Sequence, residues 1–115
     1  SPMTDAHADL SSLPKLDSDG HLVNVADWSP QVAQILADTL AVHLTDTHLA
    51  VLAAVREYYA RFSHPPMTRP LIKYLHQTLP ELELNNAKLQ QLFNTGLIAR
   101  HVNRLAGLPK PANCL

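Results

Sequence analysis

The sequence predicts a mainly α-helical fold: a small orthogonal bundle of about five helices, with an N-terminal β-hairpin and a flexible C-terminal arm. Three observations support this prediction. Apolar residues recur at spacings of three and four over most of the chain. The runs begin at residues that cap helices well and end at proline or glycine. Near the N-terminus, a turn signal is flanked by two short apolar segments.

The hairpin is predicted around residues 17–20, which read Asp-Ser-Asp-Gly. Gly20 can adopt the positive φ that tight turns need. The turn joins residues 14–16 to residues 21–25, which we expect to pair. Residues 1–13 show little pattern and are predicted to be a disordered segment, and Ser1-Pro2 before Met3 resembles the remnant of a cleaved tag.

The first two helices have clear boundaries. Ser29 and Pro30 mark the start of the first, because serine caps helices and proline suits the first helical turn. Thr45 is placed to cap the second, which continues to about Phe62 and is stopped by the prolines at 65–66. The residues expected to face inward are Val32, Ile35, Leu36, Leu40, Leu49, Leu52, Ala53, Arg56 and Tyr59.

Two shorter helices are predicted next. Thr68 is a candidate cap for the third helix, which ends before Pro80. Asn85 or Asn86 is placed to cap the fourth, and Gly96 is expected to end it.

The fifth helix and the segment after it carry the candidate chemistry. The helix is predicted from about Leu97 to Leu105, with Gly107 as its C-terminal cap. Pro109 and Pro111 then fix φ and remove two hydrogen-bond donors, which favours an extended arm over residues 107–115. Such an arm would hold Cys114 about 20–25 Å from Gly107. A carrier that must enter two active sites needs this arrangement, although a terminal cysteine can also be an incidental exposed thiol.

Composition limits the classes of protein to consider. The 115 residues suit one domain, which we assign to residues 14–106. Apolar residues make up 46% of the chain and the net charge is −1, which predicts a globular protein without general attraction to nucleic acid or anionic lipid. There is no stretch of 18 apolar residues and no export signal, so we expect a cytoplasmic protein that does not contact membranes.

The single cysteine excludes an intrachain disulfide and a cysteine-rich zinc site. The seven histidines are scattered, without a His-x-x-x-His pair, so surface or capping roles are favoured over a metal site. No phosphate-binding loop, catalytic triad or paired-carboxylate site is readable, and we predict no cofactor. If the protein is an enzyme, it is one only through its single thiol, Cys114.

The segment 105–115 resembles the signature tail of the DsrC/TusE family, an Ala-Gly-Leu-Pro-Lys-Pro run followed by a penultimate cysteine. Weaker similarities lie at residues 19–22, 27–29, 44–48, 56–59, 66–73 and 92–96, so the resemblance covers about residues 14–115. It implies a helical domain with a mobile arm whose cysteine, here Cys114, carries sulfur as a persulfide. It also implies a donor protein with a persulfide cysteine, TusBCD-like or DsrEFH-like, and a downstream acceptor protein.

The departures from the family pattern decide between its two types. DsrC proteins have a second cysteine eleven positions before the penultimate one, and here that position is Asn103. Two-thiol chemistry is therefore excluded, and the chain resembles the one-cysteine TusE type of the tRNA 2-thiouridine relay. Asn94 and Leu97 stand where the family has prolines. A DsrC-like role in dissimilatory sulfur metabolism therefore stays open as an alternative.

Basic residues suggest two further hypotheses. Four basic residues lie near Cys114 in sequence and would favour its thiolate, namely Lys110, Arg100, His101 and Arg104. The terminal carboxylate would oppose it, and the sequence leaves open which influence is larger. The helix order also resembles a helix-turn-helix, so a DNA-binding regulator, or a weak nucleic-acid contact, is the alternative from a different class. Trp28 is expected to pack in the core or on the hairpin.

Overall fold

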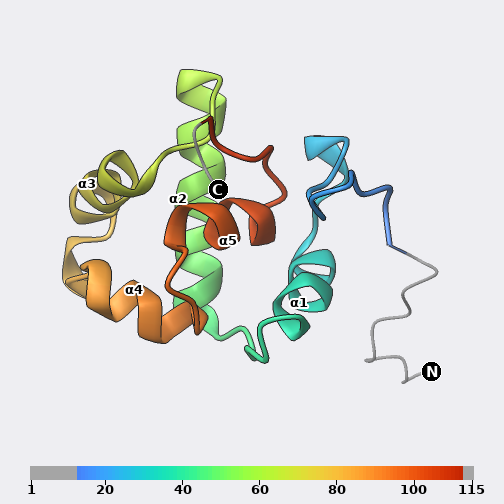
Figure 1. Cartoon of the computed structure of the whole chain (residues 1–115). Coiled ribbons are helices and arrows are strands. Elements are labelled where there is room, and N and C mark those ends of the chain that lie inside the picture. The colour runs from blue at the N-terminus through green and yellow to red at the C-terminus, as the bar shows by residue number, and fades with distance from the viewer. Residues whose placement is uncertain (1–12, 113–115) are drawn as a thin grey trace.

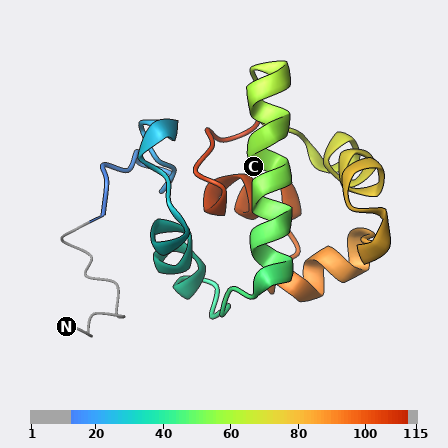
Figure 2. The same ribbon diagram turned by 180° about the vertical axis from the view of Figure 1, so that it is seen from behind.

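The computed structural model describes residues 13–112, and over this range it is helical, without strands. The longest helix, α2, is crossed by α5, with α1 on one side of it and α3 and α4 on the other (Figures 1 and 2). The prediction of a mainly helical fold with about five helices is confirmed. The elements are η2 (Val25–Asp27), α1 (Pro30–Asp38), α2 (Asp46–Phe62), α3 (Thr68–Thr78), η3 (Pro80–Leu82), α4 (Asn86–Phe93) and α5 (Ile98–Leu105).

Most helices begin where the capping residues predicted. The Ser29 side chain accepts a hydrogen bond from the Val32 N–H at 3.2 Å, and the Asn85 side chain does the same for α4. The predicted cap at Thr68 is wrong by one residue. The first carbonyl to accept a bond within α3 is that of Met67, so Met67 is the N-cap and Thr68 is already helical.

The end of α4 is set by a residue other than the glycine that we expected. Asn94, not Gly96, adopts the left-handed conformation, with φ 51°. The Thr95 N–H then reaches back to the Gln90 carbonyl at 3.1 Å. Asparagine tolerates this conformation better than most residues, so α4 ends at Phe93, three residues before the glycine.

The predicted β-hairpin is not formed in the described residues. One antiparallel bridge joins Leu16 to Leu22, and the Asp17 N–H donates to the His21 carbonyl at 2.8 Å across the turn. Pairing stops there because the chain enters η2, whose N-cap Asn24 accepts a bond from Ala26. Too few residues are left after the bridge to build two strands.

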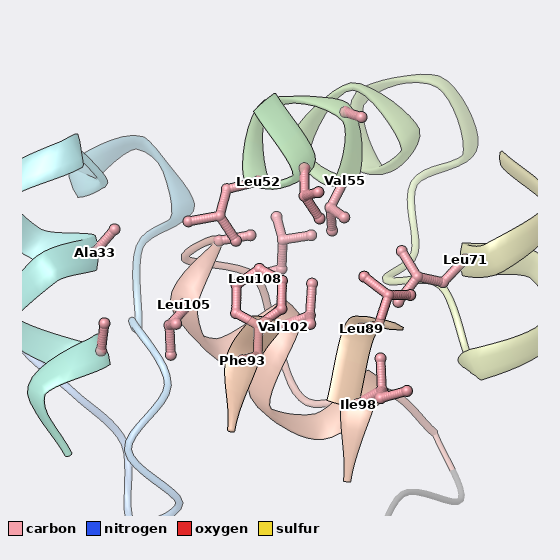
Figure 3. Close-up of a cluster of buried hydrophobic side chains, with 14 of the residues drawn as sticks. Ala33, Leu52, Val55, Leu71, Leu89, Phe93, Ile98, Val102, Leu105 and Leu108 are labelled. Atoms are coloured by element: carbon pink, nitrogen blue, oxygen red, sulfur yellow. The ribbon is translucent and has the colours of Figure 1, made fainter. Parts of the chain in front are cut away.

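All five helices contribute to the core, and its centre lies between α2, α4 and α5. Figure 3 shows the ring of Phe93 in the middle of it, among Leu52, Val102 and Leu105, all fully buried. Burial of each such side chain contributes about 1.5–3 kcal/mol of stability. One inward-facing prediction is wrong: Ala53 is exposed, and its neighbour Ala54 is buried instead.

The segment after α5 begins inside the body. Leu108 is 0% exposed and Pro111 is also buried, so the predicted start of the arm at Gly107 is too early. Leu108 belongs to the core cluster, and its apolar side chain favours burial over an extended position in solvent. Residues 1–12 and 113–115, including Cys114 and most of the predicted N-terminal segment, lie outside the described residues. No helix in the described part is long and apolar enough to span a bilayer.

Candidate functional site

The end of α5 sets the course of the chain toward Cys114. The Leu108 N–H donates to the Asn103 carbonyl at 3.0 Å, and the Gly107 N–H donates to the Arg104 carbonyl at 3.1 Å. These two bonds form a Schellman motif, with Gly107 in the left-handed conformation at φ 78°. Gly107 is therefore the helix cap that the sequence predicted.

Three side chains from distant parts of the chain bind the carbonyls of this same turn. Trp28 Nε1 donates to the Leu105 carbonyl at 2.8 Å, and Arg56 Nη1 donates to the Ala106 carbonyl at 2.9 Å. His21 Nδ1 lies 2.8 Å from the Leu108 carbonyl. A carbonyl can only accept, so Nδ1 carries the proton. We call His21, Trp28 and Arg56 the carbonyl clamp.

The members of the clamp also support one another. The guanidinium carbon of Arg56 lies 4.6 Å from the centroid of the Trp28 ring, and Arg56 Nη2 donates to the Val25 carbonyl at 3.3 Å. Burial lowers the pKa of Arg56 from its ordinary value of 12.5, but an arginine remains charged at neutral pH. A Cβ atom at Gly107 would lie 2.5 Å from Trp28 Cδ1, so only glycine fits against this ring.

Arg104 has a packing role that the sequence did not predict. It is 9% exposed, and its Nη2 donates to Thr39 Oγ1 at 2.6 Å, which joins α5 to the end of α1. Burial, and then the charge of Arg100, lower the pKa of Arg104. Burial, followed by the charges of Arg104 and Arg100, also lowers the pKa of His101. The α5 arginines therefore form a positive region that is partly committed to packing.

The other predicted site residues lie along the described segment. Pro109 and Lys110 are half-buried. Lys110 Nζ lies 4.0 Å from Asp19 Oδ2, an exposed pair that contributes little to stability. The thiol of Cys114, near which Lys110, Arg100 and Arg104 were predicted to lie, is outside the described residues.

Asn103 occupies the position at which the two-cysteine proteins have their second thiol. It is 0% exposed, and its Nδ2 donates to the Pro66 carbonyl at 2.8 Å and to the Ala99 carbonyl at 2.6 Å. The side chain therefore joins α5 to the connection between α2 and α3. A buried amide with these partners is a structural group and cannot replace a reactive thiol.

Pockets elsewhere do not involve the predicted site. Surface pockets of about 240 and 340 Å³ lie along α2 and α3. Neither is lined by a clamp residue or by a residue of the segment after α5. Across residues 13–112, no three His, Cys, Asp or Glu side chains are grouped so that they could hold a metal ion.

Comparisons with known proteins agree with the resemblance of the tail. The family model described as "DsrC like protein" matches residues 11–115. The chain belongs to the DsrC-like family. A sulfurtransferase TusE homolog of Haemophilus influenzae is 37% identical over 99 residues, covering 86% of this chain and 90% of that protein. Sulfurtransferase TusE of Yersinia pseudotuberculosis is also 37% identical, covering 86% and 91%.

Solved structures of DsrC proteins have the same fold as this DsrC-like chain. DsrC of Allochromatium vinosum superimposes with a TM-score of 0.76 at 36% identity, covering 87% of this chain and 88% of that one. The oxidized gamma-subunit of the dissimilatory sulfite reductase (DsrC) from Archaeoglobus fulgidus gives 0.73 at 29% identity, covering 89% and 92%.

The clamp is the part of this DsrC-like site that sequence reasoning missed. Trp28 was expected to pack in the core or on the hairpin, and no sequence signal connected it to residue 105, 77 positions later. His21 was placed in a strand of the predicted hairpin, and no sequence signal indicated that its side chain would be 0% exposed. The one available signal was Arg56, a charged residue on the inward face of α2, because a buried charge needs acceptors nearby.

Proposed function

We propose that this DsrC-like protein is a sulfur carrier in which Cys114 accepts sulfane sulfur as a persulfide and passes it to a partner protein. The family match over residues 11–115 carries the proposal, because it includes the segment that ends in Cys114. The curated relatives at 37% identity are sulfurtransferases by name. As the only cysteine in the chain, Cys114 is the only thiol that can perform this transfer.

The chemistry requires one thiol and no net oxidation. The Cys114 thiolate attacks the outer sulfur of a donor persulfide, the donor S–S bond breaks, and the donor leaves as a thiolate. The product is Cys114–S–SH once a proton is taken up. In the second step the acceptor's nucleophile attacks the outer sulfur, and Cys114 is released as a thiolate.

Asn103 favours the TusE-like relay of tRNA 2-thiouridylation over the two-thiol chemistry of DsrC proteins. Its amide is buried and bonded to two carbonyls, so a disulfide or trisulfide to Cys114 cannot form. The proposed partners are a TusBCD-like or DsrEFH-like donor with a persulfide cysteine and a downstream acceptor, in the cytoplasm. The alternative of nucleic-acid contact receives no support from the relatives, whose names describe sulfur transfer.

The residues before Cys114 have separate roles in this proposal. Gly107 ends α5, and Pro109 and Pro111 keep the following chain extended. Lys110 and Arg100 supply positive charge that favours the thiolate. Arg104 contributes mainly by packing α5 against α1, since its guanidinium is bonded to Thr39.

Sulfur loading tests the proposal directly. Incubation with polysulfide, or with thiosulfate and a sulfurtransferase, should add about 32 Da to the intact protein, the mass of one persulfide sulfur. The Cys114→Ala variant is the control and should gain no mass. Equal loading of that variant, or no loading of the wild type by either donor, would contradict the proposal.

A further inference from the structure

We infer that His21, Trp28 and Arg56 are positioning residues, which fix the direction in which the chain leaves the body toward Cys114. Only the expected effect of these residues on sulfur transfer rests on the proposed carrier function. This positioning task requires no contact between these side chains and the transferred sulfur. All three act through backbone carbonyls at residues 105, 106 and 108.

The hydrogen bonding at the end of α5 shows why side chains are needed there. The last carbonyls of a helix have no partner within the helix. Here backbone N–H groups reach the carbonyls of residues 102, 103 and 104. The carbonyls of residues 105 and 106 receive Trp28 and Arg56 instead, and that of residue 108 receives His21. Four consecutive residues, 105–108, are therefore fixed by bonds or by the contact of Gly107 with Trp28.

The donors approach from separate elements, so the clamp resists rotation as well as extension. His21 follows the turn at 17–20, Trp28 follows η2, and Arg56 lies on α2. Arg56 also binds the Val25 carbonyl, which ties the segment before Trp28 to the same helix. A chain held from three sides has one exit direction, whereas a chain capped only by its own backbone can swing about Gly107.

The clamp reduces the entropy that the arm loses on binding. Pro111 is still buried, and Cys114 lies three residues beyond it, a reach of about 10 Å if the chain is extended. A partner that contacts the body and also captures the thiol requires that offset to be constant. If the direction of exit varies, ordering it on binding reduces the affinity or slows the transfer.

The first experiment measures the direction of the arm without any sulfur chemistry. Cys114 is the only cysteine, so a nitroxide label attaches there alone, and its broadening of backbone amide signals reports where the tip lies. Trp28→Phe removes the indole donor, and Arg56→Lys keeps the charge but loses the fork that bridges two carbonyls. In both variants, the label should broaden the amide signals of a larger part of the protein surface than in the wild type. Arg61→Lys, an exposed position on the same helix, is the matched control and should leave the pattern unchanged.

His21 allows a rescue that a purely structural role would not show. In His21→Asn the side-chain amide stands near the position of Nδ1 and can still donate to the Leu108 carbonyl, so the wild-type pattern should persist. His21→Leu keeps the apolar volume and removes the donor, and it should spread the broadening. Should His21→Leu destabilise the fold, the comparison rests on Trp28→Phe and Arg56→Lys.

The second experiment measures transfer with donors of two sizes. Polysulfide needs only an accessible thiol and should load all variants at the wild-type rate. Transfer from a thiosulfate-loaded rhodanese-type protein should slow by about two- to tenfold in Trp28→Phe and Arg56→Lys, the range set by the net contribution of one hydrogen bond. Arg61→Lys should transfer at the wild-type rate.

The outcomes separate this inference from the proposed function. Wild-type broadening patterns in folded Trp28→Phe and Arg56→Lys would overturn the clamp as a positioning device. Equal slowing with polysulfide and with the protein donor would also overturn it, because position matters only to the large donor. If the wild type accepts no sulfur while the clamp variants still spread the broadening, the proposed function fails and the clamp stands.

Discussion

Gly107→Ala tests the packing of the α5 end most sharply. A Cβ atom at residue 107 would lie 2.5 Å from Trp28 Cδ1 and 2.8 Å from both Trp28 Cβ and Cγ. Cβ and Cγ lie close to the Trp28 backbone, so a new rotamer of the indole cannot relieve all three contacts. The segment that carries Trp28 must shift, and the bond from its Nε1 to the Leu105 carbonyl is lost with it.

Two contributions set the size of the effect. Holding alanine in the left-handed conformation costs about 1–2 kcal/mol. Leaving a buried carbonyl without its donor costs about 1–3 kcal/mol. We therefore expect Gly107→Ala to lower the free energy of unfolding by about 2–5 kcal/mol, and the lower figure applies if water reaches the Leu105 carbonyl.

The other two glycines are matched controls. Gly20 also has positive φ, 85°, but a Cβ there would come no closer than 3.7 Å to Arg104 Cδ, so Gly20→Ala should cost only the backbone contribution of about 1–2 kcal/mol. At Gly96 a Cβ meets nothing within 4 Å, and Gly96→Ala should change stability by less than about 0.5 kcal/mol. Urea unfolding followed by circular dichroism gives the three values. Equal losses for Gly107→Ala and Gly20→Ala would refute the argument from Trp28.

Three further predictions concern separate residues. Asn103→Ala should lower the free energy of unfolding by about 1–3 kcal/mol in the same urea assay, because the Pro66 carbonyl loses its buried donor; an unchanged midpoint would show that water replaces the amide. Burial and the arginines of α5 lower the pKa of His101 from its ordinary value of 6.5. As the pH falls, His101 is therefore protonated in the unfolded chain before it is protonated in the folded chain, and the free energy of unfolding should decrease below about pH 6.5. His101→Asn should weaken that dependence when urea midpoints at about pH 7.5 and about pH 5.5 are compared; an identical pH dependence in both proteins would exclude His101 as its source. Cys114→Ala should change the free energy of unfolding by less than about 0.5 kcal/mol in the urea assay. A large decrease in that free energy would mean that the thiol is packed in the core.

Local signals predicted the helical part of the fold well. Ser29, Pro30 and Thr45 mark helix starts that the structure confirms, because capping depends on residues within one turn of one another. The histidines were expected to be surface or capping residues, and His48 does cap, since its Nδ1 accepts the Thr45 N–H at 3.0 Å. His21, by contrast, is buried and binds Leu108.

The features that sequence reasoning missed depend on distant contacts or on rare backbone choices. Ala41 lies in the turn that follows α1 and has φ 58°, and no propensity favours alanine there. The Val42 N–H bonds back to the Ala37 carbonyl and Val42 is buried, so packing outweighs the local strain. The hairpin was overestimated because the turn at 17–20 is real, whereas the strands that it suggested are interrupted by η2. The arm was placed too early because the burial of Leu108 depends on residues far along the chain.

The sequence distances spanned by the clamp have a consequence for biosynthesis. Its three bonds join residues 87, 77 and 50 positions apart, so each closes a long loop. Contacts of such separation form late in folding, because the entropy of loop closure must be overcome before they stabilise anything. On the ribosome, Trp28 and Arg56 emerge long before the carbonyls that they bind. A nascent chain can assemble α1 to α3 early, but the turn at the end of α5 is anchored only after residues 105–108 have been synthesised. Newly made protein should therefore position the segment after α5 later than it forms the earlier helices.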